Sequence, residues 1–111
     1  MNFDVDDDRV QQMYAEIVPA IGELGAVEFA MTSEMLHQFC WYCVKLRDLE
    51  HTVEVEGILE ETPKGPKANP ALAVMHQFAQ RKGDLYAKVL KSVGKVSSDA
   101  ASRLASFASR H

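Results

Sequence analysis

The fold is decided by residues 32–57, which read TSEMLHQFCWYCVKLRDLEHTVEVEG. Thr32 and Ser33 are residue types that cap helix N-termini, and Gly57 readily adopts the left-handed conformation that ends helices. Between these limits, apolar side chains recur at the alternating spacing that marks one face of a packed helix. These side chains belong to Met35, Phe39, Tyr42, Leu46, Leu49 and Val53. The segment therefore predicts one long helix, and its outer side is expected to carry Trp41, Lys45, Arg47 and Asp48.

The same helix has a second apolar face, which is made of Leu36, Cys40, Cys43 and Val44. A helix that is apolar on two sides needs cover on both of them. In one interpretation the helix lies between identical subunits, and the residues expected in that contact are Phe39, Tyr42, Leu46, Leu49 and Val53. In the other interpretation it is the central helix of a three- or four-helix core within one chain. The sequence leaves both open.

Upstream of this segment, apolar residues recur with helical spacing between Val10 and Val18. They predict a first helix from about residue 7 to about residue 22. Pro19 falls inside that span, and because proline has no backbone N–H it should kink or end the helix near Val18. Residues 25–31 are expected to form a linker, with Phe29 as its contact with the core.

Downstream, the connection at residues 57–69 contains Pro63, Gly65 and Pro66. These residues exclude a regular helix. The residues on either side of them have some strand character, so a short β-hairpin is expected in this connection.

Asn69 is expected to cap a third helix, with Pro70 at the first position, where a missing N–H costs nothing. Gly94 ends this helix, and its inner face is expected to consist of Leu72, Met75, Ala79, Tyr86, Leu90 and Val93. Gly83 interrupts the helix at a cost of about 1 kcal/mol, which suggests a close helix approach or a bend there.

A fourth helix is expected to start at Ser97 or Ser98 and to bury Leu104 and Phe107. The chain has 111 residues, of which 47% are hydrophobic, enough for one domain with a modest core. The expected fold is therefore all-α and spans residues 1–111, with three to four helices and a long central pair at residues 32–56 and 70–93. Residues 1–8 are acidic and are expected to form a flexible terminus.

No apolar run approaches the roughly 20 residues that a membrane span needs, and the acidic start is the opposite of a signal peptide. The protein is expected to be soluble, to stay inside a cell and to have no membrane partner. Cys40 and Cys43, without a secretion signal, fit reduced thiols better than a disulfide.

The net charge of −4 hides an uneven arrangement. Residues 1–62 hold 3 Lys and Arg against 14 Asp and Glu, whereas residues 63–111 hold 9 against 2. The balances are −11 and +7. Such halves are either solvated faces that happen to differ, or surfaces that meet different partners. Complementary halves can also pair head to tail between identical subunits and close into a ring.

The order of elements after Thr32 carries a resemblance. An aromatic and cysteine-bearing segment (FCWYC, residues 39–43) is followed by the Gly57 stop, a Pro/Gly/Lys loop, Asn-Pro-Ala-Leu at residues 69–72, a long helix and Arg-Leu at residues 103–104. This order, over about the last eighty of 111 residues, resembles the small subunits of phage terminases, in their short all-helical group. Many members have Leu-Gly-Leu-x-Pro before the final helix, where this chain has Val-Gly-Lys-Val-Ser.

The resemblance implies a function in viral genome packaging. Terminase small subunits form homo-oligomers, recognise double-stranded viral DNA and present it to a large subunit that carries the ATPase and the nuclease. A bacteriophage protein of this kind would act in the host cytoplasm as a non-catalytic, DNA-binding regulatory subunit without a cofactor.

Several patterns that resemble chemical sites have simpler explanations. His37, Cys40 and Cys43 share a helix face but lack a fourth metal ligand, so buried thiols in an aromatic core are the favoured interpretation. Cys40 and Cys43 also form a CxxC pattern, but a redox pair sits at a helix N-terminus rather than in mid-helix. The acidic residues at 4, 6, 7 and 8 lack the spacing of a calcium loop. With no phosphate-binding loop or acid–base pair, no enzyme and no metal are expected.

DNA phosphates need clustered Lys and Arg side chains, and only the basic half supplies them. The expected contacts are Lys64, Lys67, Arg81, Lys82, Lys88 and Lys91. No helix-turn-helix is visible, so these contacts would position a duplex rather than read its sequence. The alternative is a phage-encoded helical module or regulator that binds another protein and no nucleic acid.

Overall fold

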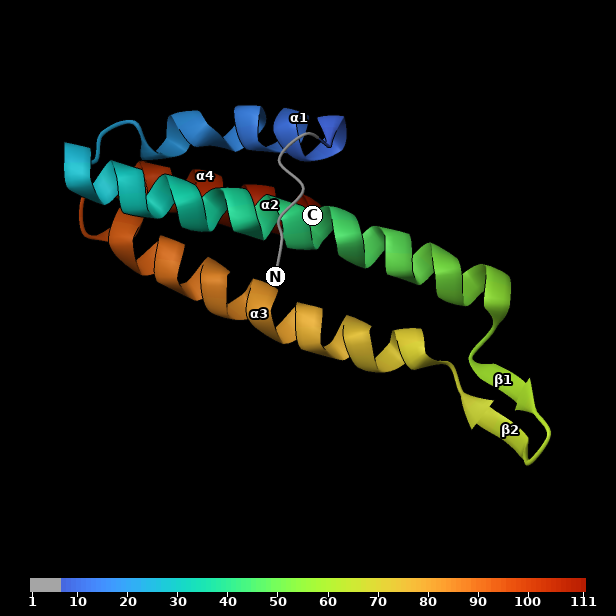
Figure 1. Cartoon of the computed structure of the whole chain (residues 1–111). Helices are drawn as coiled ribbons and strands as arrows, with labels where there is room; N and C mark the ends of the chain where they lie inside the picture. Colours follow the sequence, from blue (N-terminus) through green and yellow to red (C-terminus); the bar gives the residue numbers. More distant parts are fainter. Residues whose placement is uncertain (1–6) are drawn as a thin grey trace.

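The computed structural model describes residues 7–111, apart from the side chain of Glu60. Its elements follow in the order α1 (Asp8–Ile17), a 3-10 turn η1 (Val18–Ile21), α2 (Ala26–Glu56), β1 (Leu59–Thr62), β2 (Gly65–Ala68), α3 (Pro70–Gly94) and α4 (Ser98–Arg110). In Figure 1, α2 and α3 run antiparallel as a long pair, α1 and α4 cover one half of it, and the hairpin lies at the opposite end. The predicted all-α fold with a short hairpin is confirmed.

Local signals explain the beginning and end of α1. Asp7 is its N-cap, and its carboxylate accepts a hydrogen bond from the backbone N–H of Arg9 at 2.9 Å. The α-helix stops at Ile17 and Pro19 lies in the 3-10 turn, as predicted for the effect of that proline. The predicted flexible terminus at residues 1–8 falls mostly outside the described residues, but Asp7 and Asp8 belong to the start of α1.

The start of α2 differs from the prediction. The helix begins at Ala26 with Gly25 as its N-cap, so residues 25–31 are helix rather than linker, and Thr32 is a buried mid-helix residue rather than a cap. Glu28, in the first turn, folds back over Gly25, where an added Cβ would meet its carboxylate oxygen at 2.8 Å. This oxygen is the end of a flexible, exposed side chain that could move aside, so the cap does not require glycine.

Up to Val44, both apolar faces of α2 are covered within the chain. α3 packs along one side, α1 packs along another, and Phe107 of α4 packs against Phe39. Toward the hairpin, Leu46, Leu49 and Val53 are only half-buried, so for that part of the helix both interpretations stay open. Trp41 was expected on the outer side, and this expectation is wrong, because only 7% of the residue is exposed. Its ring packs against Phe78 of α3 at 5.5 Å and against Tyr42 at 5.1 Å between centroids.

At the hairpin end of α2 and α3, the buried residue Asn69 forms a set of hydrogen bonds that joins the two helix ends. Its side-chain oxygen accepts from the backbone N–H of Ala71 at 3.0 Å and caps α3, as predicted. Its side-chain nitrogen donates to the carbonyl of Gly57 at 2.9 Å, and its backbone N–H donates to the carbonyl of Ile58 at 2.8 Å. Gly57 ends α2 with a φ of +88°, which only glycine adopts cheaply.

The core is confined to one half of the molecule. Within residues 7–111, every fully buried apolar residue lies in the segments 10–44 and 89–107. We call this half the body, and we call residues 46–80, which comprise the end of α2, the hairpin and the start of α3, the arm. The arm extends beyond α1 and α4 and gives the chain its elongated extents of 57 × 25 × 23 Å.

Candidate functional site

The two cysteines offer no chemistry at the surface. Cys40 and Cys43 are buried in the body, and burial raises the pKa of both thiols. Among residues 7–111, no three His, Cys, Asp or Glu side chains gather where they could hold a metal ion. None of the helices in that part of the chain combines the length and the apolar character needed to cross a membrane.

A basic stripe runs along the open face of α3. Its members are exposed and follow one another at intervals of three or four residues, which places them on one side of a helix. They are Arg81, Asp84, Lys88, Lys91 and Lys95. The stripe is about 21 Å long, from the helical rise per residue, and faces away from the buried Val89 and Val93.

The two hairpin lysines are separate from this stripe. Lys64 lies in the turn between the strands and Lys67 lies on β2, and both are exposed. The helix from Pro70 to Lys88 is about 27 Å long, so the hairpin and the stripe sit at different ends of α3. The structure therefore brings Arg81, Lys88 and Lys91 together and places Lys64 and Lys67 elsewhere.

Lys82 does not belong to the stripe, because each residue along a helix turns the side chain by about 100°. It points to the α4 side of α3, where its amino group donates to the backbone oxygen of His111 at 2.6 Å. The same amino group lies 5.8 Å from the centroid of the Phe39 ring. Of the predicted DNA contacts, Lys82 is the one that the structure places in an intramolecular role.

The residues expected between subunits divide into two groups. Phe39 and Tyr42 are 3% and 2% exposed and belong to the core of the chain. Phe39 packs against Tyr86 at 6.1 Å and against Phe107 at 6.2 Å between centroids. The remaining members, Leu46, Leu49 and Val53, are half-buried in the arm.

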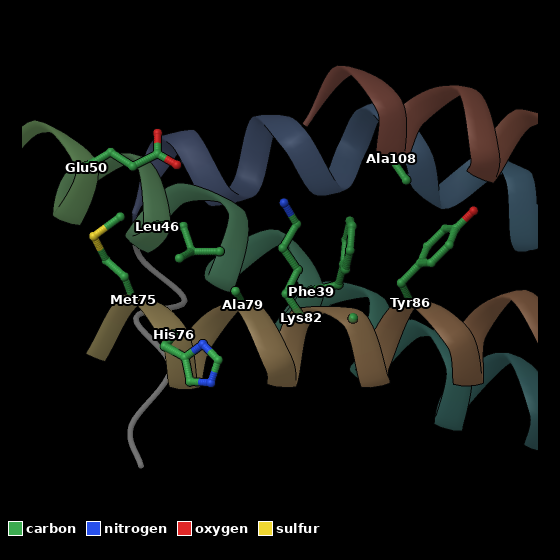
Figure 2. A pocket seen from close by; sticks show the side chains of 10 residues that line it. Phe39, Leu46, Glu50, Met75, His76, Ala79, Lys82, Tyr86 and Ala108 are labelled. Carbon is green, nitrogen blue, oxygen red and sulfur yellow. The ribbon is translucent and has the colours of Figure 1, made fainter. Parts of the chain in front are cut away.

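An apolar groove between α2 and α3 was not anticipated from the sequence. Its volume is about 640 Å³, and its lining includes Phe39, Leu46, Met75, Ala79, Tyr86 and Ala108. Figure 2 shows Ala108 of α4 at one end and Glu50 and Met75 at the other, with Lys82 projecting between them. The small residues Ala79 and Gly83, one turn apart on α3, were the sequence signal for it.

Comparisons with protein-family models, curated protein sequences and solved structures find no match to this chain. The basic stripe and the apolar groove lie on opposite sides of α3.

Proposed function

We propose that the protein is a non-catalytic adaptor for viral DNA packaging, equivalent to a terminase small subunit. It would bind the DNA at which packaging starts and engage the large ATPase and nuclease subunit. The observation that carries the proposal is the basic stripe on α3, where Arg81, Lys88 and Lys91 are exposed on one helix face.

The stripe suits a phosphate backbone better than base edges. Lys and Arg neutralise phosphates and release counterions, which gives affinity for any sequence. Asp84 lies within the stripe and weakens the local positive potential, so one chain would bind DNA weakly. Repeating the stripe in several subunits would turn weak contacts into useful affinity.

Lys64 and Lys67 would form a second contact at the tip of the arm. About 27 Å of rigid helix separates this contact from the centre of the stripe. That distance is comparable to the 34 Å length of one turn of a DNA duplex. Lys82 is left out of the contact set because its amino group is already engaged with His111 and Phe39.

The test compares two double variants that remove the same charge. Lys88→Ala with Lys91→Ala should weaken binding to duplexes of unrelated sequence alike, and should lower the slope of log affinity against log salt by about 2. Lys45→Ala with Arg47→Ala is the control, because Lys45 pairs with Asp7 at 3.6 Å and Arg47 contacts His111. Fluorescence anisotropy between about 50 and 200 mM salt measures both.

If the two double variants lose the same affinity for duplex DNA, the stripe is not the DNA contact. Binding that does not change with salt would do the same. Loss of binding on removal of Lys64 and Lys67 alone would move the contact to the arm.

Self-association is part of the same proposal. With Phe39 and Tyr42 in the core, the surfaces left for it are the acidic and basic regions of the outside and the half-buried Leu46, Leu49 and Val53. A native mass equal to a single chain at micromolar concentration would contradict the oligomer. The same measurement with the large subunit present tests the second partner.

The apolar groove favours a second candidate function, a helical module that binds another protein and no nucleic acid. The two candidates differ in one result. A regulator of this second kind would show no salt-dependent affinity for duplex DNA, whatever the state of Lys88 and Lys91.

A further inference from the structure

We propose that the groove between α2 and α3 binds one amphipathic α-helix of a partner protein, and that this helix carries Lys or Arg beside its apolar face. The inference concerns the opposite side of α3 from the basic stripe, so it does not depend on DNA binding.

The groove continues a helix-binding surface which the chain already uses. α4 packs along α3 and inserts Leu104 and Phe107, which are 2% and 0% exposed, into the body. Beyond Ala108 the same pair, α2 and α3, continues toward the hairpin and forms the open groove (Figure 2). A second helix placed end to end with α4 would therefore meet the same two helices.

Gly83 lies inside α3, where a glycine costs about 1 kcal/mol relative to alanine. No contact among residues 7–111 requires glycine here, since an added Cβ would meet none of their atoms within 4 Å. Ala79, one turn earlier, also lines the groove with a minimal side chain. Small residues on one helix face allow another helix to approach at the short end of the usual 8–10 Å between axes.

Two charged side chains line the groove, Glu50 of α2 and Lys82 of α3, and the amino group of Lys82 already donates to the backbone oxygen of His111 at the α4 end. Nearer the hairpin, residues 70–80 of α3 contain no Asp, Glu, Lys or Arg, so no charge on that wall offsets Glu50. Glu50 lines the groove, and Glu54 lies one turn further along the same face. A partner helix with basic residues on the side that faces α2 would be attracted, and an acidic one repelled.

The length of the groove limits the partner. On α2 the groove is lined from Phe39 to Glu50, a rise of about 16 Å, which matches about three helical turns. A helix of that length presents apolar anchors at positions i, i+3 or i+4 and i+7. Such a short contact lies below the size of a standard protein interface, so we expect micromolar affinity.

The experiment uses two synthetic amphipathic peptides, each of about four helical turns. Both have leucines with the spacing of Ala100, Leu104 and Phe107, and their flanking residues are Lys in one and Glu in the other. We expect the Lys peptide to bind at least tenfold more tightly. In NMR spectra of the labelled protein, it should shift the amides of Leu46, Ala79 and Gly83.

Two substitutions locate the binding surface. Gly83→Leu fills the groove and should weaken the Lys peptide at least tenfold, and replacing a helical glycine should not impair folding. Ala105→Leu is the matched control, because it adds a leucine side chain at an exposed position on α4. Ala79→Arg is a second blocking variant and places a positive charge in front of the Lys peptide.

Equal affinity of the two peptides, or normal binding by Gly83→Leu, would overturn the proposal. A lower native mass of Gly83→Leu without peptide would also overturn it, since the groove would then hold a second copy of this chain. The affinity of Gly83→Leu for duplex DNA should be unchanged. Loss of peptide binding and loss of DNA binding are therefore separate results.

Discussion

At the scale of single residues, Asp7 joins the start of α1 to α2. It caps α1, its carboxylate pairs with Arg9 at 2.9 Å, and it lies 3.6 Å from the amino group of Lys45. Arg9 in turn pairs with Asp48 of α2 at 2.6 Å. The hydrogen bond from the Arg9 side chain is the main reason why the pKa of Asp7 falls to about 2. These ion pairs lie near the surface and contribute little to stability, so Asp7 stabilises the protein chiefly as the N-cap of α1.

Asp7→Ala should lower the free energy of unfolding by about 1 kcal/mol, because it removes both the cap and the ion pairs. Asp7→Asn keeps a capping side chain and should cost less. The pKa of Asp7 in the folded protein lies below its ordinary value of 3.8, so the contribution of its charge is present above about pH 4 and is lost as the pH falls toward about 2. Urea unfolding of the wild type and both variants at neutral and acid pH measures these differences. A gap between the wild type and Asp7→Asn that persists near pH 2 would contradict this assignment.

Some residue roles were readable in the sequence and others were not. Asn69 and Ser97 were predictable as caps because their hydrogen bonds reach backbone N–H groups two and three residues away. Trp41 was misplaced because the apolar spacing of α2 does not show that Phe78 of α3 covers it. Arg81 and Lys82 are adjacent in sequence, and only the position of α4 separates an exposed side chain from an engaged one.

At the scale of elements, the boundaries with a local signal were predicted well. Gly57 ends α2 because glycine adopts a positive φ at little cost, and Pro70 opens α3 because its fixed φ suits the first turn of a helix. The start of α2 was missed because Gly25 offers no capping side chain. Leu24 and Phe29, which pack against the core on either side of that cap, occupy the positions of a hydrophobic staple and were the signal available.

Gly83→Ala should stabilise the protein by up to about 1 kcal/mol, since it removes a glycine from a helix interior where the added methyl group meets open space. Gly57→Ala is the contrasting variant. It should destabilise the protein, because its φ of +88° is unfavourable for any residue with a side chain. Thermal or urea unfolding of both variants provides the comparison. A destabilised Gly83→Ala variant would indicate that the groove is tighter than this structure has it.

At the scale of the whole molecule, the body and the arm differ in how they are held. The body holds all the fully buried apolar side chains of the described residues, while the apolar residues of the arm are at most half-buried. Val55, Ile58 and Leu59, near the tip, are more than half exposed. Local stability follows buried apolar contacts, so the arm should open more easily than the body.

Amide hydrogen exchange should show this difference within single helices. In α2, amides near Cys40 should exchange only with global unfolding, while amides near Val53 should exchange faster through local opening. In α3, the amide of Met75 should likewise exchange faster than the amide of Val89. Uniform protection along α2 would show that the arm unfolds together with the body.

The sequence predicted the fold class and the long helix pair, but not how far α1 and α4 cover that pair. Periodicity tells which side of α2 is apolar, and it does so equally for Phe39 in the body and Leu46 in the groove. The groove is the part of that side which α1 and α4 leave uncovered, and its lining comes from α2, α3 and α4, which are far apart in the sequence. No single segment reveals it.

The bonds of Asn69 have a consequence for engineering. They close the neck of the hairpin, so both helix ends are fixed before the strands begin. The cost of closing a loop grows only slowly with its length. The segment between Leu59 and Ala68 is therefore a graft site, where a longer loop, an epitope or a small inserted domain should be tolerated without a shift in the register of α2 against α3.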